Sequence, residues 1–180
     1  MFDPPTEMLD TIRQSESMAV SEVDGWTVLW MAMNCQSGPF SDVNVRKAVA
    51  YALDKDALYE GVLTENGSYA KNGMPFSSAL YGSEAESWEA YAETAVDEKN
   101  DLTKAQEYLA QSAYPDGFDC DLYINQDSIY NSIAVYVQSA LAQIGINVNI
   151  ETKRGDEMSN IQFGSTRAYD LAIVRWTADY

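Results

Sequence analysis

The chain has 180 residues, of which 46% are apolar and 22% charged, a composition typical of a globular domain that can bury a core. Its 28 acidic residues outnumber its 11 basic ones and give a net charge of −17. Such a surface repels phosphate backbones, so we expect no nucleic acid partner, and we interpret the excess as a device for solubility. No apolar run reaches the roughly 20 residues that cross a bilayer.

The first elements in chain order are a short helix and a strand. Residues 5–16 place Met8, Leu9 and Ile12 on one face at helical spacing. Residues 26–35 (WTVLWMAMNC) form a nearly continuous apolar run of strand length. We expect this strand to be buried on both faces, because only a strand between two covering layers needs apolar side chains at every position.

Two helices with acidic caps are expected next. The turn Gly38-Pro39 precedes a helix that Ser41 or Asp42 caps and that continues to Leu53. Asp54 is expected to cap a second, shorter helix. Side-chain oxygens at these positions accept hydrogen bonds from backbone N–H groups that have no partner within the helix.

Residues 64–100 follow no regular pattern. Seven carboxylates lie between Glu84 and Asp101, and only Lys99 opposes them. We interpret residues 64–100 as an acidic excursion on the surface of the domain.

The last part of the chain alternates regularly between helices and strands. The expected elements are a helix over 101–112, a strand over 120–125, a helix over 127–144, a strand over 146–150, a helix over 156–163 and a strand over 169–176. We expect Asp101 to cap the first of these helices, Asp127 to open the second and Gly145 to end it. A strand, a helix and a strand with short joints imply a parallel pair with a right-handed crossover. The predicted fold class is therefore α/β, with a mostly parallel sheet flanked by helices in a single domain over 1–180.

The residue types argue against catalysis. The chain has no histidine, which removes Ser-His and Cys-His pairs and the commonest zinc ligand sets. The glycine-rich nucleotide-binding motifs and the hydrolase nucleophile motif do not occur. Three close carboxylate pairs are interpreted as solvated charge: Asp54/Asp56, Glu84/Glu86 and Asp119/Asp121. We expect no catalytic residue, no metal site and no cofactor.

Two cysteines, Cys35 and Cys120, lie far apart in the sequence. Both fall on strands that we predict to be buried, and we expect two free thiols rather than a disulfide.

Four segments match motifs in a characteristic order. The first, over 38–55, reads GPFSD, then VRKAV, then ALDK; the second, over 105–118, is a helix followed by YPDGF. The third is LAQIGI at 141–146, and the fourth is YDLA followed by WTADY, within 169–180. Together they resemble the dipeptide/oligopeptide-binding group of the bacterial extracellular solute-binding proteins, family 5, of ABC transporters.

The resemblance implies a periplasmic-binding-protein-like lobe of the type II, peptide-binding cluster. The chain would then be most of the C-terminal lobe of a two-lobe protein, truncated at both ends. It implies a monomer, lipid-anchored in the periplasm or at the outer face of the membrane. Such a protein captures peptides without ATP and delivers them to an ABC permease complex.

The resemblance also implies ligand-binding roles for Trp176 and Asp179. In peptide-binding members the matching Asp pairs with the α-amino group of the ligand, and the matching Trp lines a side-chain pocket. The structural alternatives are a core residue for Trp176 and a helix or turn cap for Asp179. The chain departs from the family pattern at Ala113 and Arg175, where the motifs have Gly, and Arg175 lies beside the expected path of the ligand.

Other functions stay open on the sequence. A member of the same family could take a non-peptide ligand, such as a nickel chelate or a sugar. The acidic surface could also serve an interaction module for a basic partner, and a carboxylate pair could serve an α/β enzyme.

Overall fold

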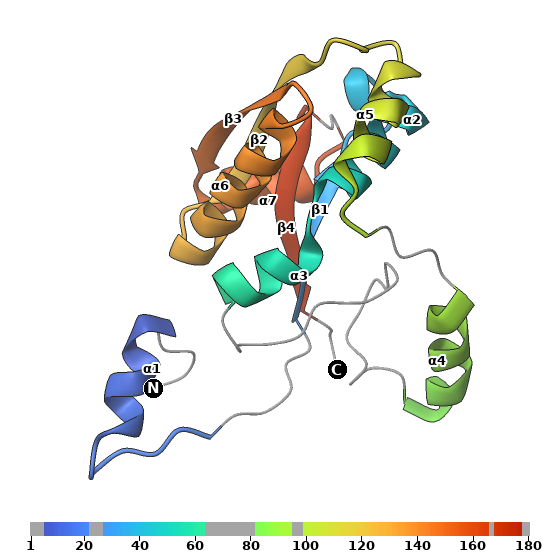
Figure 1. Cartoon of the computed structure of the whole chain (residues 1–180). Helices are drawn as coiled ribbons and strands as arrows, with labels where there is room; N and C mark the ends of the chain where they lie inside the picture. Colours follow the sequence, from blue (N-terminus) through green and yellow to red (C-terminus); the bar gives the residue numbers. More distant parts are fainter. Residues whose placement is uncertain (1–5, 22–26, 64–81, 95–98, 166–167, 178–180) are drawn as a thin grey trace.

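A four-stranded sheet organises the chain, with the strand order β1-β4-β2-β3 (Figure 1). The computed structural model describes residues 6–21, 27–63, 82–94, 99–165 and 168–177. The strands are β1 (Thr27–Met33), β2 (Phe118–Asn125), β3 (Ile146–Lys153) and β4 (Leu171–Thr177). β2 runs parallel to both β3 and β4, and β1 runs antiparallel to β4. The predicted α/β class with a mostly parallel sheet is confirmed.

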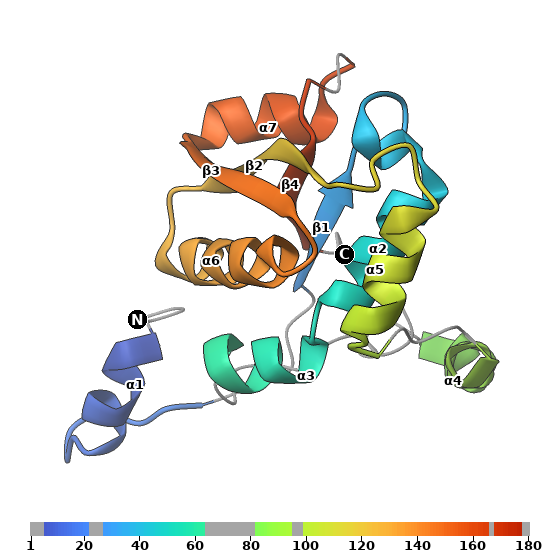
Figure 2. The same ribbon diagram turned by 45° about the horizontal axis from the view of Figure 1, so that its top comes forward.

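Helices cover both faces of this sheet. The described helices are α1 (Thr6–Arg13), α2 (Val43–Ala52), α3 (Lys55–Leu58), α4 (Ala85–Thr94), α5 (Leu102–Ala110), α6 (Ser128–Ala142) and α7 (Gly155–Phe163), with short 3-10 or π-helical turns at Pro39–Ser41, Tyr59–Leu63 and Gly82–Glu84. Of these, α1 and α4 lie away from the sheet (Figure 1). α6 and α7 lie on opposite faces, and α2 packs along α5 beside the sheet (Figure 2). Within the described residues, no helix is both long and apolar enough to cross a membrane.

Two hydrophobic cores result from this layering. The larger one lies between the sheet and the helices α2, α5 and α6, and it contains Leu122, Leu141 and Ile173. The smaller one lies between the sheet and α7, and it contains Met158 and Val174. Successive residues of β4 therefore point to opposite faces, as the pleat of a strand requires.

Four aspartates cap helices where the sequence predicts it. Asp42, Asp54, Asp101 and Asp127 each accept a hydrogen bond from a backbone N–H at the start of α2, α3, α5 and α6, at 2.8 to 3.0 Å. Each such cap contributes about 1 kcal/mol to stability. Of Ser41 and Asp42, the two candidate caps in the sequence, Asp42 is the residue that caps α2.

Asp42 also completes the end of α5. Its second carboxylate oxygen accepts from the backbone N–H of Ala113 at 3.1 Å, and Asn44 donates to the carbonyl of Gln111 at 3.2 Å. Side chains at the start of α2 thus bind backbone groups just beyond α5. This is how the chain builds a helix end at Ala113, where the motif that it resembles has glycine.

The prediction that the first strand is buried on both faces is wrong. Among the described strands β1 is an edge strand that pairs only with β4, and Leu29 and Trp30 are 39% and 40% exposed. The reason is the register: β4 pairs with β2 at Leu122↔Leu171, whereas its pairing with β1 continues to Thr27↔Thr177. The outer ends of β1 and β4 therefore extend as a two-stranded ribbon past the end of β2.

The cysteine predictions have mixed outcomes. Cys120 is buried in β2, as expected, but Cys35 is exposed because β1 ends at Met33 and Cys35 lies in the turn that follows. Both are free thiols in the described structure. The neighbouring Asn34 is buried, and its side chain binds the backbone N–H of Gln36 and the hydroxyl of Ser37.

The acidic excursion predicted over 64–100 lies partly outside the described residues, which omit 64–81 and 95–98. The described part contains α4, none of whose residues is buried. Trp88 and Tyr91 of α4 meet edge to face, with ring centroids 6.3 Å apart.

Candidate functional site

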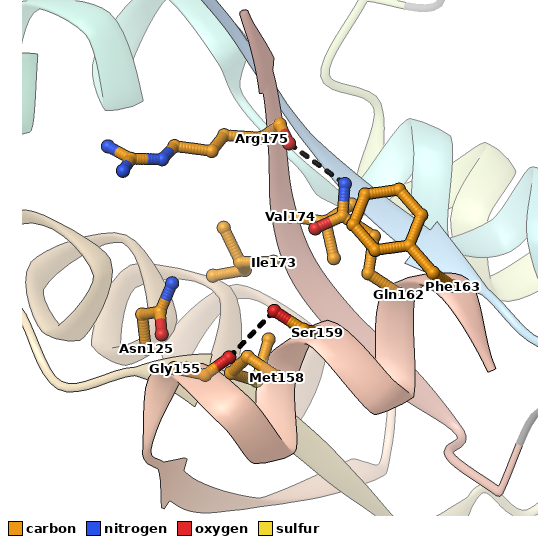
Figure 3. A pocket seen from close by; sticks show the side chains of 9 residues that line it. All are labelled: Asn125, Gly155, Met158, Ser159, Gln162, Phe163, Ile173, Val174 and Arg175. Atoms are coloured by element: carbon orange, nitrogen blue, oxygen red, sulfur yellow. Dashed lines mark hydrogen bonds between the residues drawn. The ribbon is translucent and has the colours of Figure 1, made fainter.

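A hollow of about 280 Å³ opens where β2 ends and β4 continues. The carboxyl end of β2, the helix α7 and the outer half of β4 line it (Figure 3). The lining residues are Asn125, Gly155, Met158, Ser159, Gln162, Phe163, Ile173, Val174 and Arg175. Ligands of open α/β sheets bind beyond the carboxyl ends of the strands, so the position of this hollow makes it the candidate binding site.

The ribbon of β1 and β4 forms one wall of the site. Residues 171–174 of β4 are buried, whereas Arg175, Trp176 and Thr177 are exposed, and the change comes where β2 ends. The side chain of Gln162 in α7 donates to the carbonyl of Arg175 at 2.9 Å and ties the helix to this exposed part of β4. The site is thus built on a strand that its neighbours fix in place.

Trp176 lies on this exposed part of β4, with 48% of its surface accessible. The alternative that it is a core residue is therefore wrong. Its ring meets the ring of Phe163 edge to face, with centroids 6.1 Å apart and planes inclined by 72°. Phe163 ends α7 and is 65% exposed. Sequence reasoning missed Phe163, because nothing local shows that the end of α7 lies against β4.

Asp179, the second predicted site residue, lies outside the described residues. Its role stays a prediction. Of the predicted pair, only Trp176 has a described position.

Arg175 points to the other side of β4. In Figure 3 its guanidinium and the amide of Asn125 lie on one side of the strand, while Gln162 and Phe163 lie on the other. The buried Tyr130 of α6 belongs to the same side, together with Ile173. Burial raises the pKa of the Tyr130 hydroxyl, the charge of Arg175 and the amide of Asn125 lower it, and the charge of Asp127 raises it.

The carboxylate pair Asp119/Asp121 has structural partners. Asp119 and Asp121 on β2 accept hydrogen bonds from Asn147 and Asn149 on β3, at 2.8 and 2.9 Å. These contacts cross-link two neighbouring strands on an exposed face. In the part of the chain that the structure describes, no group of three or more side chains could hold a metal ion.

The sequence pattern of the bacterial extracellular solute-binding proteins, family 5 (middle region), matches residues 1–180. The chain belongs to this family. Family 5 consists of solute-binding proteins that act outside the cytoplasm and are not enzymes. The family resemblance and the non-enzymatic interpretation of the sequence are thereby confirmed.

Three relatives show how far the similarity extends. The chain is 31% identical to heme-binding protein A of Haemophilus influenzae, over 98% of the chain and 31% of that protein. It is 26% identical to the probable D,D-dipeptide-binding periplasmic protein DdpA of Escherichia coli, over 98% of the chain and 32% of that protein. Its fold matches the periplasmic binding protein DppA of Helicobacter pylori in complex with the peptide STSA, with a TM-score of 0.81 and 26% identity over 98% of the chain and 32% of that protein.

The family-5 chain therefore spans about a third of the length of the relatives that it matches. The ligands named for these relatives differ chemically: a heme, a D,D-dipeptide and the peptide STSA. Membership of the family thus does not select one solute.

Proposed function

We propose that the chain is the C-terminal ligand-binding lobe of a protein that captures peptides outside the membrane and delivers them to an ABC permease complex. The observation that carries this proposal is the part of β4 that extends past β2, beside the hollow, with the exposed ring of Trp176 on it. The two peptide-binding proteins among the relatives named above support the same ligand class.

An extended peptide suits this wall of the site. Over Arg175 to Thr177, β4 pairs with β1 on one edge, and among the described strands none pairs with its other edge. An edge strand presents N–H and C=O groups that an extended chain can pair with, and such pairing gives affinity without dependence on the ligand's sequence. The carbonyl of Arg175 is already bound by Gln162, so we expect pairing at the other groups of this segment.

Two further contacts would recognise a side chain and the N-terminus of the peptide. In this proposal Trp176 and Phe163 form a pocket for an apolar or aromatic side chain of the ligand, because both rings are exposed and fixed against each other. Asp179 would pair with the α-ammonium group of the peptide. An enclosed ammonium group loses its water and needs a negative partner.

The rest of the proposal concerns the whole protein. It would be a monomer with a second lobe that closes over the peptide, and a lipid anchor would hold it in the periplasm or at the outer face of the membrane. One relative is a heme-binding protein, so heme is the second candidate ligand. A nickel chelate or a sugar is the further alternative within the family.

Calorimetry on the full-length protein tests the proposal. The protein is unfolded and refolded to remove bound ligand, then titrated with pools of two- to five-residue peptides and, separately, with heme, nickel–histidine and oligosaccharides. We expect a peptide pool to bind with a Kd of about 1 µM or tighter, which corresponds to about −8 kcal/mol. Binding of a non-peptide ligand together with no binding of any peptide pool would contradict the proposal.

A further inference from the structure

Asp54 joins two helices and holds the start of the second. It lies between α2, which ends at Ala52, and α3, which begins at Lys55, and its own backbone is extended. Its carboxylate accepts from the backbone N–H of Ala57 at 3.0 Å, and its carbonyl accepts from the N–H of Leu58 at 3.0 Å. A helix of a single turn gains little from its own hydrogen bonds, so α3 depends on this residue.

The hydroxyl of Tyr136, on α6, binds both backbone groups of Asp54. It donates to the carbonyl at 2.7 Å and accepts from the N–H at 2.9 Å, across 82 positions of the chain. Burial raises the pKa of this hydroxyl, the hydrogen bond to the Asp54 backbone lowers it and the charge of Asp54 raises it, with a net increase over the ordinary 10.0. The hydroxyl therefore keeps its proton at neutral pH and can donate.

The end of α2 is held from another direction. The side-chain amide of Asn100 donates to the carbonyl of Ala52 at 3.1 Å, and the N–H of Asp101 donates to the carbonyl of Tyr51 at 2.9 Å. α2 also packs along α5 and contributes buried residues to the core. The joint at Asp54 thus has a fixed side, which is α2, and Tyr136 holds its other side.

The segment beyond the joint, Lys55–Leu63, is called the arm here. It consists of α3 and the π-helical turn Tyr59–Leu63, which packs on α6. None of residues 55–62 is buried. A segment that buries few apolar contacts opens at a low free energy, and π-helical turns occur frequently at functional sites.

We propose that the arm opens as one unit about Asp54 and that the Tyr136 hydroxyl is the latch that keeps it closed on α6. In the closed arm the hydroxyl satisfies the N–H and the carbonyl of Asp54 at a half-buried position. In the open arm water can bind both groups. Removal of the hydroxyl leaves two unsatisfied groups in the closed arm only, and this shifts the balance toward the open arm.

The arm lies at the ligand end of the lobe. In Figures 1 and 2, α3 lies toward the end of the ribbon at which β1 begins, and there Thr27 pairs with Thr177. α7 and the hollow border this end on one face of the sheet, and the arm borders it on the α6 face. A peptide paired with the free edge of β4 would run between them, so the arm acts as a lid that a bound peptide holds closed. The lid role rests on the proposed function, whereas the latch does not.

Hydrogen exchange followed by mass spectrometry on the full-length protein tests the latch without any ligand. In the wild type we expect the amides of residues 54–63 to exchange together and faster than those of α2 and α6. Tyr136→Phe should raise the exchange rates of 54–63 by about tenfold and leave those of α2 and α6 unchanged. The control is Tyr108→Phe, at a half-buried tyrosine of α5 whose hydroxyl makes no hydrogen bond with any described residue. It should leave the arm as it is in the wild type.

Three results would overturn the latch. The first is an arm that exchanges in Tyr136→Phe as it does in the wild type. The second is a rise that extends over α2 and α6, because the hydroxyl would then stabilise the lobe as a whole. The third needs no variant: an arm that exchanges in the wild type as slowly as α6 does not open by itself.

The lid is tested by adding pools of two- to five-residue peptides to the wild type. At a peptide concentration of about ten times the Kd, the exchange of residues 54–63 should slow by about tenfold, because only the closed arm binds. Peptide binding in calorimetry that leaves the exchange of the arm unchanged would overturn the lid while the proposed function stands. If no pool binds, the proposed function is wrong and the lid with it, and the exchange of the free protein still decides the latch.

Discussion

The rings of Phe163 and Trp176 meet edge to face at the open end of the sheet, with centroids 6.1 Å apart. One ring ends α7 and the other lies on the outer part of β4, and they are 65% and 48% exposed. Because both rings face solvent, they contribute little to the core. The contact fixes their positions, which is the arrangement that a recognition surface needs.

The first prediction concerns this aromatic pair. In the full-length protein Trp176→Ala should weaken peptide binding by about 2 kcal/mol, as the loss of an aromatic anchor does, with little change in melting temperature. Phe163→Leu should have a smaller effect in the same direction, because it leaves the indole in place. The control is Val135→Ala, at a side chain of α6 that is 49% exposed, which should alter neither property. Unchanged affinity in Trp176→Ala, measured by calorimetry, would remove Trp176 from the site.

The second prediction concerns Asp179. Asp179→Asn keeps the shape of the side chain and removes its charge, so an enclosed α-ammonium group would lack its partner. We expect a loss of about 2–5 kcal/mol in binding free energy. N-acetylation of the peptide should cause most of that loss in the wild type and add little in the variant. Equal binding of free and acetylated peptides to the wild type would show that the amine is not the anchor.

The third prediction concerns two glycines at the starts of β2 and β3. Gly117 and Gly145 have φ of +87° and +81°, and a Cβ on Gly117 would lie 2.0 Å from the carbonyl oxygen of Gly145. Backbone cannot move aside as a flexible side chain can. We therefore expect Gly117→Ala to lower the free energy of unfolding by at least about 2 kcal/mol, from left-handed strain and overlap together.

Gly61→Ala is the matched control for this substitution. Nothing lies within 4 Å of the position that its Cβ would take, and its φ is outside the left-handed region. The free energy of unfolding of Gly61→Ala should stay within about 0.5 kcal/mol of that of the wild type. Urea unfolding followed by circular dichroism measures both variants. Equal stability of the two variants would contradict the close approach of Gly117 and Gly145.

The fourth prediction concerns the two thiols. Burial, followed by the negative charges of Asp170, Asp121 and Asp119, raises the pKa of Cys120 from 9.0 to about 12. At pH 8 only about one thiol in 10⁴ would be the reactive thiolate, and the surrounding core also blocks access. Cys35 is exposed and should react within the mixing time of a thiol reagent, whereas Cys120 should react only after unfolding.

The pH dependence of the Cys120 thiol follows from the direction of the shift. The unfolded chain releases this proton near pH 9, before the native protein does, so Cys120 lowers the free energy of unfolding as the pH rises from about 9 toward 12. Cys35→Ser isolates the slow thiol for the kinetic measurement. Thiol titration of the denatured wild type without reductant should return both thiols, and a titration that finds neither would show a disulfide.

The sequence alone determined the features that depend on local interactions. Asp42, Asp54, Asp101 and Asp127 cap helices a few residues away, and Gly145 ends α6, so each of these features depends on neighbours in the chain. The strand–helix–strand alternation likewise indicated the parallel pairing of β2 with β3, because a helix that packs back on the sheet returns the chain to the end where the first strand began. The order of the four motifs identified the family.

The tertiary structure decided what depends on register and strand order. The apolar run of β1 shows that its side chains are hydrophobic, but not that the strand lies at an edge of the sheet with its outer part past the end of β2. The candidate site joins Asn125, Phe163 and Trp176, which lie up to 51 positions apart in the sequence. Only the pairing of β2 with β4, which stops short of Arg175, brings these residues to one end of the sheet.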